Sequence, residues 1–306
     1  MAVLNEYGNA ATSKVGALEA SDLEAPMLNI QSLESDASAL SPTVQRRLWT
    51  YIGEANFFSQ LLQADLNSLK DGDAAIEVGS GIGLLALQLG RLGHPIAAFE
   101  PESSGFGEMY AMRNLVRDNW VNDSCDIRWL DDRLMEYDSR IVDLTPKYAY
   151  AVNVLEHVVD IEEFLTTVLS NLRPGGQFRF ICPNYAYPYE PHFEMPTLFS
   201  KRATYSVMNR RIAASEISDP YGLWNELSWP TTRSLRKLLV SMNLRHCFHA
   251  SATQAYLQRP LQDPTFMARK GRTARSIFRV AALTLPRVAN NLPRGGLPII
   301  DCTIYV

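Results

Sequence analysis

The amino-acid sequence predicts an α/β protein with a largely parallel sheet that helices cover on both faces. From residue 74 onward, short apolar runs with strand character alternate with segments of helical periodicity. This alternation is typical of strand–helix–strand units, which build parallel sheets. A glycine-rich turn joins the first strand of this region to its first helix. The composition also indicates a folded globular chain, because 46% of the 306 residues are hydrophobic and 20% are charged.

The chain ahead of the sheet divides into two parts. Residues 1–40 hold six acidic residues against one basic residue, Lys14, among many small residues. We expect this segment to be a loosely ordered arm. Residues 41–73 are expected to form a helical segment, because Ser41 suits an N-cap and Pro42 suits the first helical position. Apolar residues then recur at helical spacing.

The region from residue 74 to residue 306 is predicted to form one domain. Its first five strands are predicted at 74–79, 95–100, 125–130, 147–154 and 176–183. The helices between them are predicted at 83–92, 104–118 and 160–172.

Two stretches of this domain fit the alternation poorly, and we interpret both as insertions. Residues 184–230 are rich in proline and aromatic residues, and residues 252–295 are rich in arginine. Between the two insertions, residues 231–244 have the apolar spacing of a helix, and a short strand follows. The apolar residues 297–306 are predicted to form the last strand.

The glycine-rich turn lies in the segment AIEVGSGIGLLALQLG, residues 75–90. Glycines at such a turn let the backbone approach a ligand and present helix N-terminal N–H groups to an anion. The dinucleotide fingerprint requires a glycine at the sixth position counted from Gly79, but that position is Leu84. The observed pattern is E-x-G-x-G-x-G, from Glu77 to Gly83. A tight turn that packs helix on sheet is the alternative explanation.

Acidic residues end the next two strands, at the edge where open α/β sheets bind their ligands. Glu100 lies 21 residues after Gly79 (100 − 79), where a carboxylate can accept hydrogen bonds from both hydroxyls of a ribose. Asp131 and Asp132 end the third strand. A nucleotide bound across the glycine turn and these acids would account for all of these features.

With these motifs in place, the sequence resembles the class I S-adenosylmethionine-dependent methyltransferases. The E-x-G-x-G-x-G pattern resembles their first motif, and residues 153–184 resemble the segment from the fourth to the fifth strand of the small-molecule enzymes. The resemblance implies a doubly wound, seven-stranded Rossmann-like sheet. Its last strand would be antiparallel and lie between the fifth and sixth strands.

The resemblance also implies S-adenosyl-L-methionine as the cofactor and suggests how it binds. The glycines would border its methionine part, Glu100 would bind its ribose, and Asp131 or Asp132 would lie near its adenine. The predicted cofactor-binding residues are Glu77, Gly79, Ser80, Gly81, Gly83, Glu100, Asp131, Asp132 and Asn153.

The methyl transfer itself requires mainly an aligned acceptor and the exclusion of water, and an acceptor that carries a proton also needs a base. The predicted catalytic residues are Glu156 and His157 after the fourth strand and His192 after the fifth. A helix-start packing role is the alternative for Glu156 and His157. In the ubiquinone-pathway O-methyltransferases, which this segment resembles, the motif E-x-x-E-H is associated with a divalent metal. Here Asn153 replaces the first acid, so we expect no metal site.

The loop CPNYAYPYEPHFEMP, residues 182–196, is predicted to form the acceptor pocket. Its tyrosines would stack on a sugar or an aromatic ring. The predicted substrate-binding residues are Tyr185, Tyr187, Tyr189, Glu190 and Phe193. A proline-stiffened surface loop that packs on the sheet is the alternative.

The charge distribution bears on partners and location. A net charge of −4 provides no argument for nucleic-acid binding. Residues 259–294 carry eight basic residues against one acid, with apolar residues between them. This pattern is typical of a solvated helix face, and the alternative is an amphipathic element that rests peripherally on anionic lipid. We expect a cytoplasmic protein, because no signal peptide, membrane-length apolar run or C-x-x-C spacing is present.

The leading hypothesis is a methyltransferase that acts on a small metabolite, a saccharide or a lipid-linked acceptor, with oxygen the favoured acceptor atom. The missing sixth-position glycine counts against an NAD(P)-dependent oxidoreductase. A third hypothesis is a methyltransferase-like partner protein that binds the cofactor without catalysis. Intact Glu77, Glu100 and glycines disfavour it.

Overall fold

The computed structural model describes most of the chain from residue 37 onward. The described residues are 37–38, 40–101, 107–120, 125–131, 134, 144, 146–198, 200–215, 217, 219–262, 267, 282 and 292–306. The predicted amino-terminal arm therefore lies almost entirely outside them. Asp132 and most of the basic stretch 259–294 also lie outside the described residues.

The helix α2, Pro42–Asn67, precedes the sheet, in agreement with the predicted N-cap signal. The Ser41 hydroxyl accepts a hydrogen bond from the Val44 backbone N–H at 3.4 Å, and a proline follows at the first helical position. Leu48 and Leu62 are fully buried on the face of the helix that packs toward the sheet.

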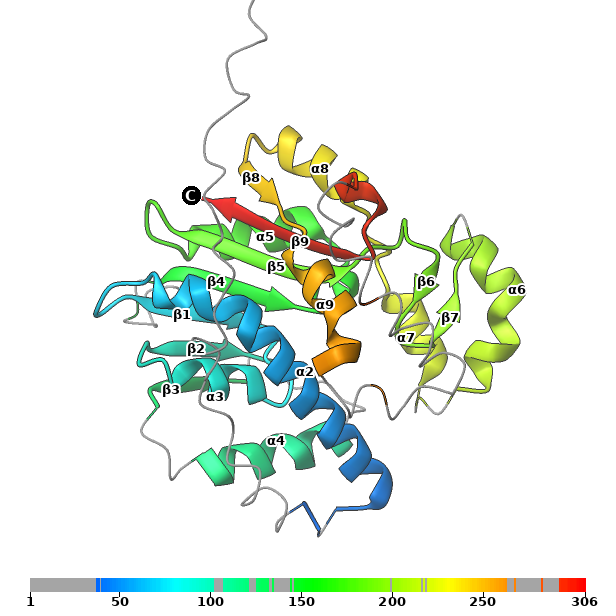
Figure 1. Ribbon diagram of the computed structural model, residues 1–306, viewed down its shortest axis with the longest axis horizontal. Helices are drawn as coiled ribbons and strands as arrows, with labels where there is room; N and C mark the ends of the chain where they lie inside the picture. The colour runs from blue at the N-terminus through cyan, green and yellow to red at the C-terminus, as the bar shows by residue number, and fades with distance from the viewer. Residues whose placement is uncertain are drawn as a thin grey trace, which may run out of the picture.

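Seven strands form one twisted sheet at the centre of the molecule (Figure 1). They are β1 (Ala74–Val78), β2 (Ile96–Phe99), β3 (Ile127–Leu130), β4 (Pro146–Val152), β5 (Gln177–Pro183), β8 (Arg245–Phe248) and β9 (Ile299–Tyr305). The spatial order is β3-β2-β1-β4-β5-β9-β8. β9 is antiparallel to both of its neighbours, and the other pairs are parallel. This topology confirms the predicted sheet, including the antiparallel last strand between the fifth and sixth strands.

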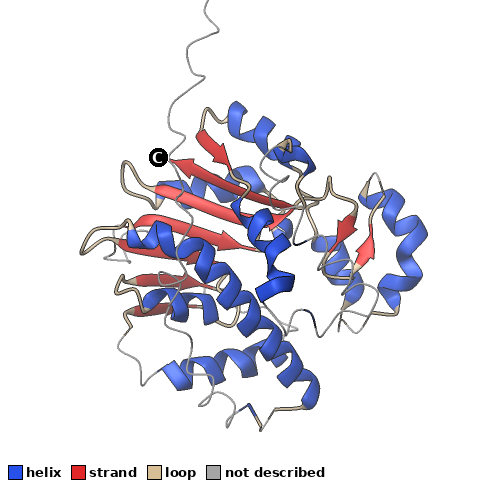
Figure 2. Cartoon of the chain, in the orientation of Figure 1, coloured by secondary structure: helices blue, strands red, loops and turns tan. Residues whose placement is uncertain are grey.

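Helices cover both faces of the sheet, as the alternation predicted (Figure 2). They are α3 (Leu84–Gly90), α4 (Gly107–Trp120), the short 3-10 helix η3 (Leu155–His157), α5 (Ile161–Ser170), α8 (Thr232–Ser241), α9 (Ser251–Gln262) and the 3-10 helix η4 (Arg294–Gly296). Residues of α2, α3, α4 and α9 share one apolar core with the sheet, and residues of α5 and α8 share a second core on the opposite face.

The segment that we interpret as the first insertion has secondary structure and a core of its own. It contains β6 (Tyr189–Glu190), β7 (Met195–Pro196), α6 (Lys201–Ala213) and α7 (Pro220–Glu226). Figure 1 shows these elements grouped beyond the carboxyl ends of β4 and β5. The buried apolar residues of this core, which come from these elements and the loops beside them, are Tyr185, Phe193, Met195, Ile212, Trp224 and Leu227.

The described start of the second interpreted insertion is the helix α9, and it packs on the sheet. Ala252 is buried in the same core as α2, with Tyr256 packed against it. Arg259 is also buried, and its Nη1 lies 2.8 Å from Glu54 Oε1. This corrects the interpretation of Arg259 as part of a basic surface, because an ion pair with α2 holds it inside. The basic residues of the stretch 259–294 that lie outside the described part are Arg269, Lys270, Arg272, Arg275, Arg279 and Arg287.

Among the described residues, no helix is both long enough and apolar enough to span a membrane.

Candidate active site

The carboxyl ends of the parallel strands bring most of the predicted site residues to one edge of the sheet. The glycine turn follows β1, Glu100 follows β2, and Asp131 follows β3. The segment from Asn153 to His157 follows β4, and the loop that contains His192 follows β5. This edge is where open α/β sheets bind their ligands.

The three glycines of the turn all have positive φ angles, but they face different surroundings. A Cβ added at Gly79 would overlap with Val154 Cγ2, and one added at Gly83 would overlap with the Trp129 ring. A Cβ at Gly81 would meet no atom within 4 Å. Two of the glycines are therefore required for packing, and the backbone at Gly81 is the part of the turn that a ligand can approach.

Glu100 is attached to this turn. The Gly81 N–H donates to Glu100 Oε2 at 2.8 Å, and Arg113 Nη2 lies 3.8 Å from Glu100 Oε1. Arg113 Nε also donates to the Gly81 carbonyl at 3.2 Å. Burial raises the pKa of Glu100, and the Gly81 hydrogen bond and the Arg113 charge offset this only in part. The carboxylate that we predict to bind ribose is thus fixed beside the open glycine.

Asp131 pairs with an arginine of α4. Arg117 Nη2 donates to its Oδ1 at 2.5 Å and Arg117 Nη1 to its Oδ2 at 3.2 Å. A hydrogen bond from Arg117 holds the pKa of Asp131 below its usual value. Both carboxylate oxygens are therefore engaged by arginine, and the position of Asp131 near the adenine stays a prediction. The sequence alone did not single out Arg113 or Arg117.

The remaining predicted cofactor residues lie under and beside the turn. Glu77 is buried within the sheet, where the Tyr150 hydroxyl donates to its Oε2 at 3.3 Å. Burial raises the pKa of Glu77 to about 8. Ser80 is buried, and its N–H donates to the Phe99 carbonyl at 2.9 Å. Asn153 is exposed at the end of β4, with φ of 55°.

The three predicted catalytic side chains come together. The rings of His157 and His192 meet edge to face, with centroids 5.2 Å apart. One ligand-type atom from each of Glu156, His157 and His192 lies within 4.8 Å of the corresponding atoms of the other two. The sequence separates Glu156 from His192 by a strand and a loop, and the fold brings them into one cluster.

The electrostatics differ among the members of this cluster. Burial raises the pKa of Glu156 to about 7. Burial and the nearby His192 lower the pKa of His157 to about 4, so His157 is neutral at physiological pH. Burial lowers the pKa of His192, but the hydrogen bond to Glu190 and the charges of Glu190 and Glu156 outweigh it, and the net shift is upward.

Glu190 holds His192 in place. His192 Nδ1 lies 2.7 Å from Glu190 Oε1, which also accepts a hydrogen bond from the Tyr185 hydroxyl at 3.2 Å. The Phe193 N–H donates to Glu190 Oε2 at 2.6 Å. Glu190 is fully buried. This corrects its predicted role as an acceptor contact, because both oxygens are used to hold the loop and the histidine.

The aromatic residues of the loop divide into buried and exposed groups. Tyr185 is buried and stacks on Trp229 with centroids 4.3 Å apart, and Phe193 packs edge to face on Trp224. These two predicted acceptor contacts therefore belong to the core of the insertion. Tyr187 and Tyr189 are exposed, at 41% and 36%.

Two residues that the sequence did not single out tie the end of the insertion to the catalytic segment. The Ser228 N–H donates to the Glu156 carbonyl at 2.6 Å, and the Ser228 hydroxyl donates to the Leu155 carbonyl at 2.9 Å. The next residue, Trp229, has a φ of 61°, a backbone conformation that residues other than glycine rarely adopt. The aromatic–proline pair at 229–230 is the sequence signal that could have marked this junction.

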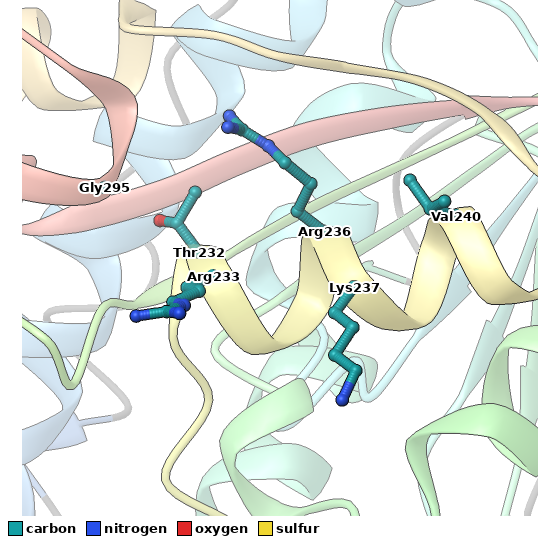
Figure 3. Close-up of a pocket in the computed structure, with 6 residues that line it drawn as sticks. All are labelled: Thr232, Arg233, Arg236, Lys237, Val240 and Gly295. Carbon is teal, nitrogen blue, oxygen red and sulfur yellow. The ribbon is translucent and has the colours of Figure 1, made fainter.

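A basic surface pocket lies apart from these residues, along α8 and beside Gly295 (Figure 3). Figure 3 shows the side chains of Arg233, Arg236 and Lys237 pointing in different directions, so they do not converge on one ligand. None of the predicted site residues lines this pocket.

The sheet order, the antiparallel last strand and the glycine turn at the carboxyl edge define a Rossmann-like methyltransferase fold. Comparison with known proteins agrees: residues 51–247 match the model of a family described as a methyltransferase domain. The chain belongs to this methyltransferase family, as the motifs predicted. The oxidoreductase hypothesis is therefore not retained.

Several relatives are similar to this chain. The uncharacterized protein Rv1509 of Mycobacterium tuberculosis (strain ATCC 25618 / H37Rv) is 31% identical over 286 residues, which cover 88% of this chain and 91% of that protein. Among solved structures, a geranyl diphosphate methyltransferase in complex with GPP and sinefungin is 12% identical, with a TM-score of 0.45 over 81% of this chain and 75% of that chain. The phosphoethanolamine N-methyltransferase 2 of Haemonchus contortus is 13% identical, with a TM-score of 0.46 over 81% of this chain but only 51% of that chain.

Proposed function

We propose that this protein transfers the methyl group of S-adenosyl-L-methionine to an oxygen atom of a small metabolite, a saccharide or a lipid-linked acceptor. The observation that carries the proposal is the pair of the buried Glu190 and the partly exposed His192, which faces His157 and Glu156 at the carboxyl edge of the sheet. A carboxylate that orients a histidine is the arrangement that general-base catalysis uses.

The residues around the glycine turn fit the cofactor. Open space at Gly81 admits the amino-acid portion, and Glu100 beside it is partly exposed and can accept hydrogen bonds from ribose hydroxyls. When bound, S-adenosylmethionine supplies a methyl group on a positively charged sulfur, and loss of that methyl group leaves neutral S-adenosylhomocysteine.

His192 is the residue that takes the acceptor's proton. If its Nδ1 carries the hydrogen that is donated to Glu190, its Nε2 has a free lone pair. As the new C–O bond forms, the hydroxyl proton passes to this Nε2, so the acceptor oxygen gains the methyl group without gaining charge. The buried Glu156, in its ionised form, adds negative charge that stabilises the resulting imidazolium.

Two features support an oxygen acceptor in a small molecule. A hydroxyl keeps its proton at neutral pH, so an oriented base is of most use for this acceptor. The exposed Tyr187 and Tyr189 on the same loop provide aromatic surfaces on which a sugar ring or an apolar chain can stack.

The acceptor can be sought directly. The purified protein would be incubated with S-adenosylmethionine labelled in its methyl group and with polar and lipid extracts of cells that lack the protein. We expect label in one small-molecule or lipid fraction, in a linkage that resists alkali as an ether does. Label only in macromolecules, or only on nitrogen, would overturn the acceptor assignment.

With a labelled product in hand, His192→Ala tests the base. We expect turnover to fall by roughly 10²–10⁴-fold, the usual contribution of a general base. S-adenosylhomocysteine should bind with unchanged affinity by calorimetry, because His192 lies outside the glycine turn. The matched control is His94→Ala in the loop before β2. Full turnover by His192→Ala would refute the base assignment.

A further inference from the structure

Three metal-ligating side chains meet where the segment after β4 faces the loop after β5. Glu156, His157 and His192 each offer one ligand atom, and these three atoms lie within 4.8 Å of one another. Two imidazoles and one carboxylate are the donor set of many zinc sites, and they suit Zn²⁺ far better than Mg²⁺, which prefers oxygen.

The buried carboxylate of this cluster has no hydrogen-bond partner in the part of the chain that the structure describes. Glu156 is fully buried, and neither of its oxygens has a hydrogen-bond partner among the described residues. A buried carboxylate in this condition is costly unless it is protonated or meets a cation. A bound metal ion would supply the missing partner, and the two histidines stand where they would complete its coordination.

One of the two histidines is already oriented as a metal ligand. Metal-bound histidines usually donate their second ring N–H to a carboxylate or carbonyl. His192 has such a partner in Glu190, which is itself held by the Tyr185 hydroxyl and the Phe193 N–H. The expectation of no metal rested on Asn153 in the segment after β4, but the third donor comes from the insertion, which that segment does not reveal.

We propose that Glu156, His157 and His192 bind one divalent transition-metal ion of the Zn²⁺ type, and that this ion blocks methyl transfer. The block follows because the metal occupies the His192 lone pair that otherwise accepts the proton. The binding part of the proposal is independent of the reaction, whereas the blocking part rests on the proposed function.

The binding part is tested with tag-free, full-length protein, because a polyhistidine tag would itself bind zinc. We expect calorimetry to show one Zn²⁺ per chain and no comparable binding of Mg²⁺. Glu156→Gln, which keeps the shape of the side chain, and His192→Ala should each weaken Zn²⁺ binding by at least about tenfold. The controls are His94→Ala and His246→Ala, which should bind like the parent protein.

Glu190→Gln provides a second measurement that does not remove a ligand. Because Glu190 holds His192 from outside the site, Glu190→Gln should lower the Zn²⁺ affinity roughly tenfold. Circular dichroism and a melting curve establish that each variant is folded. Absence of Zn²⁺ binding by the parent, or parent-like Zn²⁺ affinity in folded Glu156→Gln and His192→Ala, would overturn the site.

The blocking part is tested by titrating Zn²⁺ into the methyl-transfer assay in a metal-free buffer. Transfer should decline with the same midpoint as binding, and a chelator should restore it. Zinc that binds at the site but leaves transfer unchanged or increases it would refute the block while the site itself stands. Full transfer by zinc-free His192→Ala would refute the base assignment, and the calorimetry would still decide the metal site.

Discussion

At the scale of single residues, the cluster around His192 contains four ionisable side chains that perform different tasks because their surroundings differ. Glu190 and Glu156 are both fully buried, but Glu190 accepts three hydrogen bonds, whereas the Glu156 side chain accepts none from the residues that the structure describes. His157 has a pKa lowered to about 4, whereas the pKa of its neighbour His192 is raised. Only His192 therefore combines an orienting partner with a basicity suited to proton transfer.

Glu190→Gln tests this division of roles through the tautomer of His192. The glutamine oxygen must face the Phe193 N–H, so its amide NH₂ group faces His192 Nδ1 and donates to it. The hydrogen of the ring then moves to Nε2, which can no longer accept a proton. We expect kcat to fall by roughly 10²–10⁴-fold with KM nearly unchanged, as a wrong histidine tautomer does in serine proteases.

The control for this variant is Glu162→Gln, an exposed residue of α5. It should keep parent-like kcat and KM in the same assay. If Glu190→Gln raised KM while kcat stayed at the parent value, Glu190 would be an acceptor contact after all, and its positioning role would be lost.

Glu77 makes a separate prediction about pH and stability. Its pKa is raised to about 8 by burial, so the folded protein keeps Glu77 protonated at a pH where the unfolded chain ionises it. The stability of the apo protein should therefore fall as the pH rises from about 4.5 to 8. Glu77→Gln imitates the protonated acid and removes this loss.

We expect Glu77→Gln to melt at least roughly 2 °C above the parent at pH 8, which corresponds to about 1 kcal/mol, with a smaller difference at pH 5. Differential scanning calorimetry without cofactor measures both values. A difference that stays constant between pH 5 and 8 would show that Glu77 does not remain protonated in the fold.

Sequence reasoning located the residues of the site better than it assigned their contacts. Strand ends and glycine spacing place Glu100, His157 and His192 at one edge without any structure. The partners of these residues depend on packing between segments far apart in the chain. The pairing of Asp131 with Arg117 could not be predicted, because the arginine lies on a helix and the sequence does not determine which face of that helix points toward Asp131.

At the scale of elements, the turn between β1 and α3 separates packing from binding. Gly79 and Gly83 have neighbours where a Cβ would stand, and Gly81 has none. The glycine spacing alone suggested that all three glycines allow a ligand to approach the backbone. A Cβ at Gly79 would overlap with Val154 in the segment after β4, and a Cβ at Gly83 would overlap with Trp129 of β3.

Gly79→Ala should destabilise the protein by roughly 2–4 kcal/mol, because it combines a positive φ angle with the overlap. Val154→Ala removes the overlapping methyl groups. The double variant should therefore be more stable than the sum of the two single changes by about 1 kcal/mol. Urea denaturation of the four proteins gives the coupling, and strict additivity would contradict the predicted contact.

Gly81→Ala is the matched substitution in open space. It carries the positive φ angle without the overlap, so we expect a loss of only about 1–2 kcal/mol. Its Cβ would occupy the space assigned to the cofactor, so calorimetry should show S-adenosylhomocysteine affinity reduced at least tenfold. Parent-like affinity in this variant would place the cofactor elsewhere.

The elements themselves follow closely from local signals. The Ser41 cap, the Arg-Pro-Gly-Gly stop and the run 297–306 correspond to the observed start of α2, the end of α5 and the strand β9. The internal structure of residues 184–230 could not be derived in the same way. Two-residue strands and a core of scattered aromatic residues have no periodicity that a sequence pattern detects.

At the scale of the whole molecule, one buried ionic network joins the sheet to the helices on its face. Arg179 of β5 donates two hydrogen bonds to Asp301 of β9, each at 2.9 Å. It also donates to Asp65 of α2 at 2.8 Å and to the Ser251 hydroxyl at the start of α9 at 3.2 Å. Elements from four distant parts of the chain thus depend on a single guanidinium group.

The sequence contained a sign of this network, in the form of opposite charges within two apolar strands. Arg179 and Asp301 lie diagonally across the antiparallel pair, since Arg179 is opposite Thr303 and Asp301 is opposite Ile181. Recognising this diagonal requires knowledge that β9 inserts beside β5. The charges become interpretable only after the topology is known.

Arg179→Met tests how far the network supports the fold. Removal of one partner leaves the buried Asp301 uncompensated, so we expect a loss of about 3–5 kcal/mol at pH 7. The double variant Arg179→Met with Asp301→Asn removes the unpaired buried charge and should recover part of that loss of stability. Equal stability of the single and double variants would show that Asp301 does not carry an unpaired charge when Arg179 is absent.

The pH dependence of this variant provides the sharpest check. Burial raises the pKa of Asp301, but the hydrogen bonds and charge of Arg179 outweigh this and keep the pKa below its usual value. The contribution of Asp301 is therefore present above a pH of about 4 and declines as the pH falls through the lowered pKa. Without Arg179 the burial effect is opposed only by weaker partners such as His249 and the Ser251 hydroxyl, so the variant loses stability as the pH rises. The difference in unfolding free energy between parent and Arg179→Met should thus be larger at pH 7 than at pH 4.5 in urea titrations, and a difference independent of pH would refute the ionic account.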